Sequence, residues 1–191
     1  MANESTVRVL GISGSLRKGS FNTALLRAAE KAAGEGIAFE TATLHGIPLY
    51  DGDVEAEEGI PAAAAALKER IAESDGVLLV TPEYNNGMPG VFKNAIDWCS
   101  RPPEDADRVF AGRPFALIGA SPSAFGTILS QANWLPVMKT LKVELWSGAK
   151  LYVSRAGQAF DADGGLADEK VRKQLADFVK GFADFAVGRR A

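Results

Sequence analysis

The side chains best suited to chemistry in this chain lie between Gly14 and Asn22, in the run GSLRKGSFN. Ser15, Ser20 and Asn22 can donate hydrogen bonds, and the guanidinium of Arg17 can hold two oxygens of one phosphate group at once. The glycines of the run allow the backbone to turn and to approach a ligand closely. This combination of residue types predicts a site for an anion.

The segments on either side of this run would place it between a strand and a helix. An apolar run over residues 6–13 reads as a buried strand, and apolar residues recur at helical spacing over residues 20–34. Ser20 is placed to cap the helix, so that the first helical N–H groups and the positive end of the helix dipole face the loop. A phosphate group suits that place. A serine-rich connection without a ligand remains the alternative, because such turns are common.

Spacing separates the known phosphate-binding loops. The triphosphate loop G-x-x-x-x-G-K-[ST] needs lysine and Ser/Thr where this chain has Ser20 and Phe21. Gly11, Gly14 and Gly19 are spaced wrongly for the dinucleotide motif G-x-G-x-x-G. A loop that binds a monophosphate is what remains.

Composition narrows the possible partners and compartments. The chain has 191 residues, 47% of them hydrophobic, which predicts one domain over residues 1–191 with a full core. Its net charge of -3 gives no reason to expect nucleic acid or an anionic membrane as a partner. Because the sequence shows neither a membrane-length apolar run nor a signal peptide, a cytoplasmic location is expected.

Cys99 and His45 are the only cysteine and the only histidine. The chain therefore offers almost nothing from which to build an intrachain disulfide, a zinc site of Cys and His, or a Ser-His or Cys-His nucleophile. His45 receives no role. The chemistry is expected to come from a cofactor.

Strand and helix patterns alternate along the chain. Strands are expected over residues 6–13, 37–43, 77–80 and 115–118 and within 142–153, with helices between them and after Leu166. The acidic segment 44–60 is expected to be irregular. A polar connection that contains proline is expected before Phe115, and Pro136 is expected to kink or shorten its helix. This alternation predicts an α/β fold, a doubly wound five-stranded parallel sheet of flavodoxin-like order 2-1-3-4-5 with helices on both faces.

A second polar stretch, TPEYNNGMPG, begins at Thr81, directly after the most apolar strand. In such sheets ligands collect at the carboxyl ends of strands where the strand order reverses, so this stretch and the first run should be neighbours. Asn85 tolerates unusual backbone angles, and Gly87 and Gly90 keep side chains away from a flat ligand. A third stretch, rich in serine and glycine, over residues 119–126 should border the same crevice.

The first and second of these stretches resemble the signatures of the bacterial NAD(P)H-dependent FMN reductase family. This is the flavodoxin-like group that includes chromate, quinone, azo and ferric reductases. The similarity rests on GSLRKGSFN from Gly14, on PEYN from Pro82, and on KNAIDW from Lys93. The run IPLYD from Ile47 also matches, so the resemblance covers nearly the whole chain. Thr127 stands where the family commonly has a glycine.

The resemblance implies non-covalently bound FMN as cofactor, with NADPH or NADH as hydride donor. It places the FMN phosphate on the first stretch, at Ser15, Arg17, Lys18, Gly19, Ser20, Phe21 and Asn22. It places the isoalloxazine ring on Pro82, Glu83, Tyr84 and Asn85, with Ser121 completing the site. A homodimer or homotetramer is also implied, with Trp98, Trp134 and Phe125 as candidate contacts and packing in the core as the alternative for all three.

The expected reaction is a ping-pong cycle in which NAD(P)H reduces bound FMN and leaves before a small-molecule acceptor takes the same face. Quinones, flavins, azo dyes, chromate and ferric chelates are the candidate acceptors. Glu83 is either a general acid or a structural acceptor of hydrogen bonds, and Arg101 either meets an acceptor's charge or ends a helix in solvent. Two other functions stay open: a flavodoxin-type single-electron carrier and a binding protein for another nucleotide.

Overall fold

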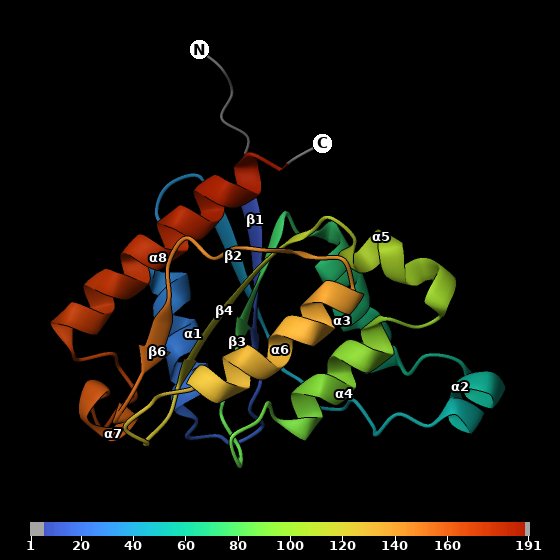
Figure 1. Cartoon of the computed structure of the whole chain (residues 1–191), viewed down its shortest axis with the longest axis horizontal. Helices are drawn as coiled ribbons and strands as arrows, with labels where there is room; N and C mark the ends of the chain where they lie inside the picture. Colours follow the sequence, from blue (N-terminus) through green and yellow to red (C-terminus); the bar gives the residue numbers. More distant parts are fainter. Residues whose placement is uncertain (1–5, 190–191) are drawn as a thin grey trace.

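The computed structural model describes residues 6–189, and a parallel β-sheet forms its centre (Figure 1). The strands follow the order β2-β1-β3-β4-β5, and β6 also pairs with β4. Their bounds are β1 (Val7–Ser13), β2 (Ile37–Ala42), β3 (Gly76–Val80), β4 (Pro114–Ala120), β5 (Glu144–Leu145) and β6 (Leu151–Val153). The predicted parallel sheet and its order are confirmed.

The fifth position of the sheet is occupied by two short strands, where the sequence predicted one. β5 pairs with the beginning of β4 and β6 with its end. Between them the chain leaves the sheet, close to Trp146, whose ring packs edge-on against Phe178 with 4.7 Å between the centroids. The edge strand is thus interrupted beside a packed aromatic contact with the C-terminal helix.

Helices cover both faces of the sheet (Figure 1). On one face lie α1 (Phe21–Ala32) and α8 (Glu169–Val187), and on the other α3 (Ala62–Glu73), α4 (Gly90–Cys99) and α6 (Ile128–Thr140). Leu78 of β3 packs in the first layer and Leu79 in the second. A central strand covered on both sides must be apolar at every position, which explains the uninterrupted run in the sequence.

Four short helical segments lie outside the helices that the sequence predicted. They are α2 (Gly52–Glu58), η1 (Pro103–Asp105), α5 (Ala106–Phe110) and α7 (Ala156–Ala159). The expectation that 44–60 is irregular was wrong for α2, which buries none of its residues and so shows no apolar periodicity. Its signal was local instead, since the carboxylate of Asp51 caps it by accepting a hydrogen bond from the N–H of Asp53 at 2.9 Å.

Pro136 lies inside α6, which continues to Thr140, so the expected shortening at that residue was wrong. Proline removes the N–H that would bond to the carbonyl of Ala132. Both residues are on the exposed side of α6, where water can satisfy that carbonyl. Among residues 6–189, no helix combines the length and apolar character that crossing a membrane requires.

Three loops follow the carboxyl ends of the central strands and lie at the lower edge of the sheet in Figure 1. The first loop (residues 14–20) joins β1 to α1, the second loop (81–89) joins β3 to α4, and the third loop (121–127) joins β4 to α6. These connections carry the residues that the sequence singled out.

Candidate functional site

The first loop presents hydrogen-bond donors and positive charge together. The Oγ of Ser20 accepts bonds from the N–H groups of Asn22 at 3.2 Å and Thr23 at 3.4 Å, which confirms Ser20 as the N-cap of α1. The first turn of α1 contains no acidic residue. Arg17 and Lys18 are exposed beside it, and the Arg17 guanidinium carbon lies 5.9 Å from the centre of the Phe21 ring. A helix N-terminus with this surround favours an anion.

The first and second loops touch at Gly14. Its N–H donates to the carbonyl of Val80 at 2.9 Å. A methyl group at Gly14 would lie only 2.2 Å from Cδ1 of Phe92 and 2.9 Å from Cδ of Pro82. The prediction that these two loops are neighbours is therefore confirmed, and their approach is so close that only glycine fits.

The second loop contains a tight hairpin. Tyr84 and Gly87 bond to each other through both backbone pairs at 3.0 Å, and the two residues between them have positive φ, 50° at Asn85 and 62° at Asn86. These are the features of a type I′ turn, in which asparagine is favoured. Tyr84 is half exposed beside the turn. A Cβ at Gly90 would meet nothing within 4 Å, so space is left at the base of this loop.

A buried polar cluster, which no sequence pattern indicated, lies at the start of the second loop. The Oγ1 of Thr81 accepts a bond from Nε1 of Trp134 at 3.1 Å and lies 2.8 Å from the Oγ of Ser130. Thr81, Ser130 and Trp134 are all fully buried. Trp134 and Trp98 therefore belong to the interior, whereas Phe125, the third candidate contact residue, is 77% exposed.

Asn22 and Glu83 bond to the protein backbone. The side-chain amide of Asn22 donates to the carbonyl of Ala120 and accepts from its N–H, both at 2.8 Å. Oε2 of Glu83 accepts from the N–H groups of Leu129 at 2.9 Å and Ser130 at 3.0 Å. Glu83 is thus an acceptor of structural hydrogen bonds in this structure.

Ser121 bonds within its own loop. Its Oγ donates to the Oγ of Ser123 at 3.2 Å and accepts from the Ser123 N–H at 3.2 Å. Gly19 and Lys18 are exposed, whereas Ser15 and Pro82 are buried. The predicted site residues thus gather at one edge of the sheet; their contacts with a cofactor stay a prediction.

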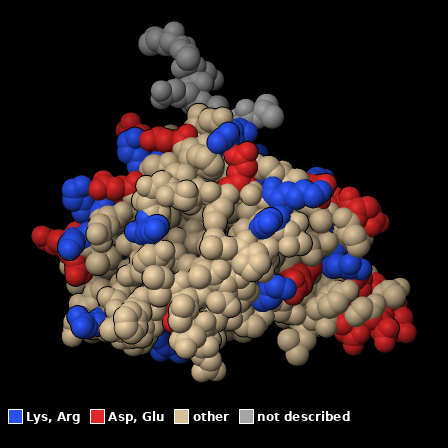
Figure 2. Space-filling view, in the orientation of Figure 1, with Lys and Arg blue, Asp and Glu red and all other residues tan. Residues whose placement is uncertain are grey.

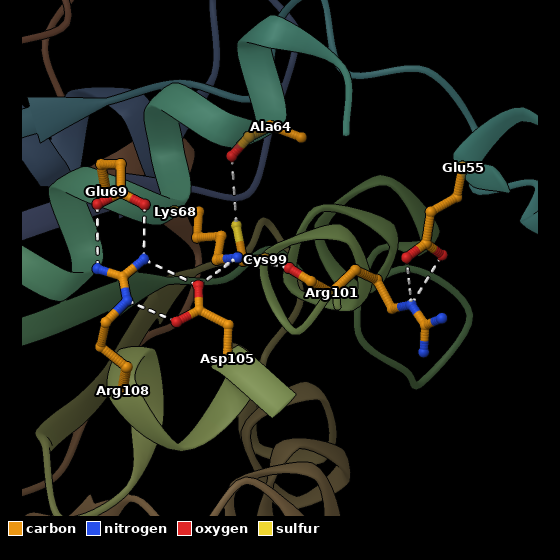
Figure 3. Close-up of polar contacts among 8 residues, drawn as sticks. All are labelled: Glu55, Ala64, Lys68, Glu69, Cys99, Arg101, Asp105 and Arg108. Atoms are coloured by element: carbon orange, nitrogen blue, oxygen red, sulfur yellow. Dashed lines mark hydrogen bonds and ion pairs between the residues drawn. The ribbon is translucent and has the colours of Figure 1, made fainter. Parts of the chain in front are cut away.

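Arg101 is paired within the chain (Figure 3). Its Nε donates to the carboxylate of Glu55 at 2.8 and 3.0 Å, and the hydroxyl of Tyr50 donates to the same carboxylate at 2.9 Å. The Arg101 bond lowers the pKa of Glu55, and the bond to Glu55 raises the pKa of Tyr50. Nε1 of Trp98 donates to the carbonyl of Pro48 at 3.0 Å. Together these contacts fasten the acidic segment around α2 to α4.

The free thiol of Cys99 is buried and unsuited to nucleophilic chemistry. Burial raises the pKa of Cys99 to about 12, so it stays protonated at neutral pH. Close by, the ammonium of Lys68 contacts the carboxylate of Asp105 at 2.6 Å and the carbonyl of Arg101 at 2.6 Å (Figure 3). Arg108 adds bonds to Asp105 and Glu69. These bonds join α3, η1 and α5 to the chain just after α4, and their role is structural.

We expect Asp105→Asn to lower the melting temperature by several degrees at neutral pH. Arg108 and then Lys68 hold the pKa of Asp105 well below its usual range. Its carboxylate therefore stabilises the folded chain above about pH 4, the ordinary aspartate value, and this contribution is lost as the pH falls through the lower folded value. Thermal unfolding from pH 2 to 7 should show the two proteins converging in acid. Asp107→Asn, whose partner Lys142 is exposed, should change little.

The residues at the loop edge fit a flavin monophosphate. Hydroxyl and backbone N–H groups lie at the first turn of α1, the exposed Arg17 and Lys18 precede it, and the turn contains no carboxylate. The adjacent second loop offers a half-exposed aromatic residue and open space at Gly90. Such a donor set suits a phosphate with an attached flat ring.

The model of the NADPH-dependent FMN reductase family matches residues 7–158. The chain belongs to this family. The match contains all three loops, so the predicted family, fold and FMN cofactor with NAD(P)H as reductant are confirmed.

Curated relatives and a solved structure agree with this family. The chain is 46% identical over 169 residues to an NAD(P)H-dependent FMN reductase of Pseudomonas aeruginosa, covering 88% of this chain and 89% of that one. It is 38% identical over 184 residues to a 2-hydroxy-1,4-benzoquinone reductase of a Burkholderia species, covering 96% and 98%. FerB, a flavoenzyme NAD(P)H:(acceptor) oxidoreductase of Paracoccus denitrificans, superposes with a TM-score of 0.85 at 36% identity over 96% of this chain and 99% of FerB. The expected oxidoreductase class is confirmed.

Proposed function

We propose that this FMN-dependent NAD(P)H oxidoreductase uses quinones as its acceptors in a ping-pong cycle, with one FMN-binding domain and a cytoplasmic location. The observation that supports the placement of the site is the contact between the first and second loops at Gly14. The Burkholderia relative is named for a benzoquinone, which favours quinones over the other predicted acceptors. Chromate, ferric chelates, free flavins and azo dyes remain predictions to be compared with quinones in the same assay.

In this proposal the first loop holds the phosphate and the second loop lines the ring. Ser15 and Ser20 each accept a backbone N–H, which leaves their own hydroxyl protons to donate to phosphate oxygens. Arg17 and Lys18 neutralise the phosphate charge. The type I′ turn at Asn85 and Asn86 holds the backbone of the second loop in one conformation, so that the loop would need little reorganisation to line the ring.

FMN held by these loops would supply the redox chemistry, that is, hydride acceptance from NAD(P)H and electron transfer to the acceptor. The decisive experiment adds NADPH or NADH to the purified, FMN-loaded protein under nitrogen in a stopped-flow spectrometer. We expect rapid bleaching of the flavin band and recovery on adding benzoquinone, with parallel lines in initial-rate plots. A flavin band unchanged by either nucleotide would overturn the proposal.

Arg17→Ala should weaken FMN binding by about 10- to 100-fold, because charge-assisted hydrogen bonds contribute about 1.5–3 kcal/mol each. Riboflavin, which has no phosphate, should bind the variant and the parent protein equally. Fluorescence titration of the apoprotein measures both constants. Arg27→Ala, an exposed arginine further along α1, is the matched control and should leave both unchanged. Equal loss of both ligands would place the phosphate elsewhere.

We also infer that the molecule self-associates through the exposed face of α6 and the third loop. Apolar side chains are exposed there, namely Phe125, Ile128, Leu129 and Leu135. Figure 2 shows that charged residues gather mainly toward the margins of this side of the molecule. The mass in solution, measured by light scattering after gel filtration, should be that of a dimer or tetramer; a monomer would contradict the inference.

A further inference from the structure

Hydrogen bonds at the two ends of the third loop link it to the segment after the first loop and to the second loop. At its start, both polar atoms of the Asn22 amide are bonded to the backbone of Ala120, a residue 98 positions away in sequence. Asn22 is 4% exposed. Because the amide makes one donor and one acceptor bond in the interior, its replacement leaves backbone groups of Ala120 without these partners.

At its other end, the third loop passes into α6, whose N-terminus is capped from outside. Thr127 occupies the N-cap position but makes no capping bond, since its buried hydroxyl accepts a bond from Gln131 at 3.1 Å. The carboxylate of Glu83 supplies the cap instead, with two backbone bonds at 2.9 and 3.0 Å. A carboxylate at this end of a helix is also favoured by the helix dipole.

We propose that Asn22 and Glu83 are positioning residues that fix the two ends of the third loop and do not ligate the cofactor. Asn22 extends from the first turn after the first loop, and Glu83 belongs to the second loop. Asn22 therefore ties the first turn of α1 to the residue that precedes the third loop, and Glu83 ties the second loop to the first turn of α6, which follows it. Bonds within the protein itself therefore hold the three loops in their relative positions.

This inference refines the proposed function, on whose FMN site it rests, and it gives Asn22 a role other than phosphate binding. A phosphate ligand and a positioning residue differ in a measurable way. Loss of a ligand affects FMN but not riboflavin, whereas loss of loop position affects every ligand that the three loops surround. The Arg17→Ala variant supplies the reference pattern for a phosphate contact.

For Asn22→Ala we expect FMN and riboflavin affinities to fall by the same factor, about tenfold for the loss of buried hydrogen bonds. Hydrogen exchange of the apoprotein should become faster over residues 120–130. Selective loss of FMN affinity, with riboflavin affinity and exchange unchanged, would overturn the proposal for Asn22. Circular dichroism would verify that the variant folds, and Asn22→Ser, a smaller polar residue that introduces no charge, is the second variant if alanine does not fold.

For Glu83, the pair Glu83→Gln and Glu83→Ala separates capping from acid catalysis. Glutamine keeps an acceptor oxygen, so its kcat and pH profile should stay within about threefold of the parent, while alanine should weaken FMN and riboflavin equally. If Glu83 were a general acid, both variants would lose kcat alike and one limb of the pH profile. Glu57→Gln on the exposed face of α2 is the control.

The apoprotein exchange measurement does not depend on FMN. If the parent protein fails to bind FMN but both alanine variants still accelerate exchange over residues 120–130, the proposed function is wrong and the positioning role of Asn22 and Glu83 is supported. If FMN binds and exchange is unaltered in both variants, only the positioning role of Asn22 and Glu83 is wrong.

Discussion

Gly14→Ala should abolish tight FMN binding and lower the free energy of unfolding by about 3 kcal/mol, the cost of overpacking a well-packed site. The added methyl would lie 2.2 Å from Cδ1 of Phe92. Phe92 cannot turn aside easily, because its ring is fully buried and packs edge-on against Trp134 with 5.1 Å between centroids. The clash is therefore relieved by moving the first loop away from the second. We expect FMN affinity to fall by about 100-fold or more, since the loops must act together.

Two further variants make this expectation specific. Gly34→Ala is the matched control, since a methyl there meets nothing within 4 Å, and its melting temperature and FMN affinity should equal those of the parent. Phe92→Leu removes the ring atoms that the methyl would strike, so the double variant should bind FMN more tightly than Gly14→Ala alone. A Gly14→Ala protein with the stability and FMN affinity of the parent would show that the loops do not need this contact.

The sheet and the loop edge were predictable because each carries a local signal. Ser20 precedes an amphipathic helix in the usual capping position, and the run at Val77 is apolar at every residue. Parallel strand topology then brings the ends of β1 and β3 together without further information. The resemblance of the two motifs to one family added the cofactor, which the strand pattern could not supply.

What the sequence could not give are contacts between residues far apart in the chain. The bond between Asn22 and Ala120 and the cap that Glu83 provides for α6 join segments that no periodicity relates. The exposed helix α2 was missed because it buries nothing and is held by the pair between Arg101 and Glu55. Contacts with residues distant in the sequence determine these features. Local sequence alone predicted an irregular loop at α2 and cofactor contacts for Asn22 and Glu83.

Thr81→Val should cost about 3 kcal/mol of unfolding free energy although it changes almost no volume. Valine has the shape of threonine but no hydroxyl, so Nε1 of Trp134 and the Oγ of Ser130 would each lose a partner in the interior. A buried donor that loses its acceptor costs about 1–3 kcal/mol. Denaturant unfolding monitored by tryptophan fluorescence measures the effect.

Thr81→Ser is the matched control, because it keeps the hydroxyl and removes only a methyl group, for a cost of about 1 kcal/mol. If serine were as damaging as valine, packing rather than hydrogen bonding would be the cause. Combining Thr81→Val with Trp134→Phe gives the decisive measurement. Phenylalanine has no N–H to leave unpaired, so the double variant should lose less than the sum of the two single losses, by about 1–2 kcal/mol. The coupling energy measures the bond between Trp134 and the buried hydroxyl of Thr81, the first residue of the second loop.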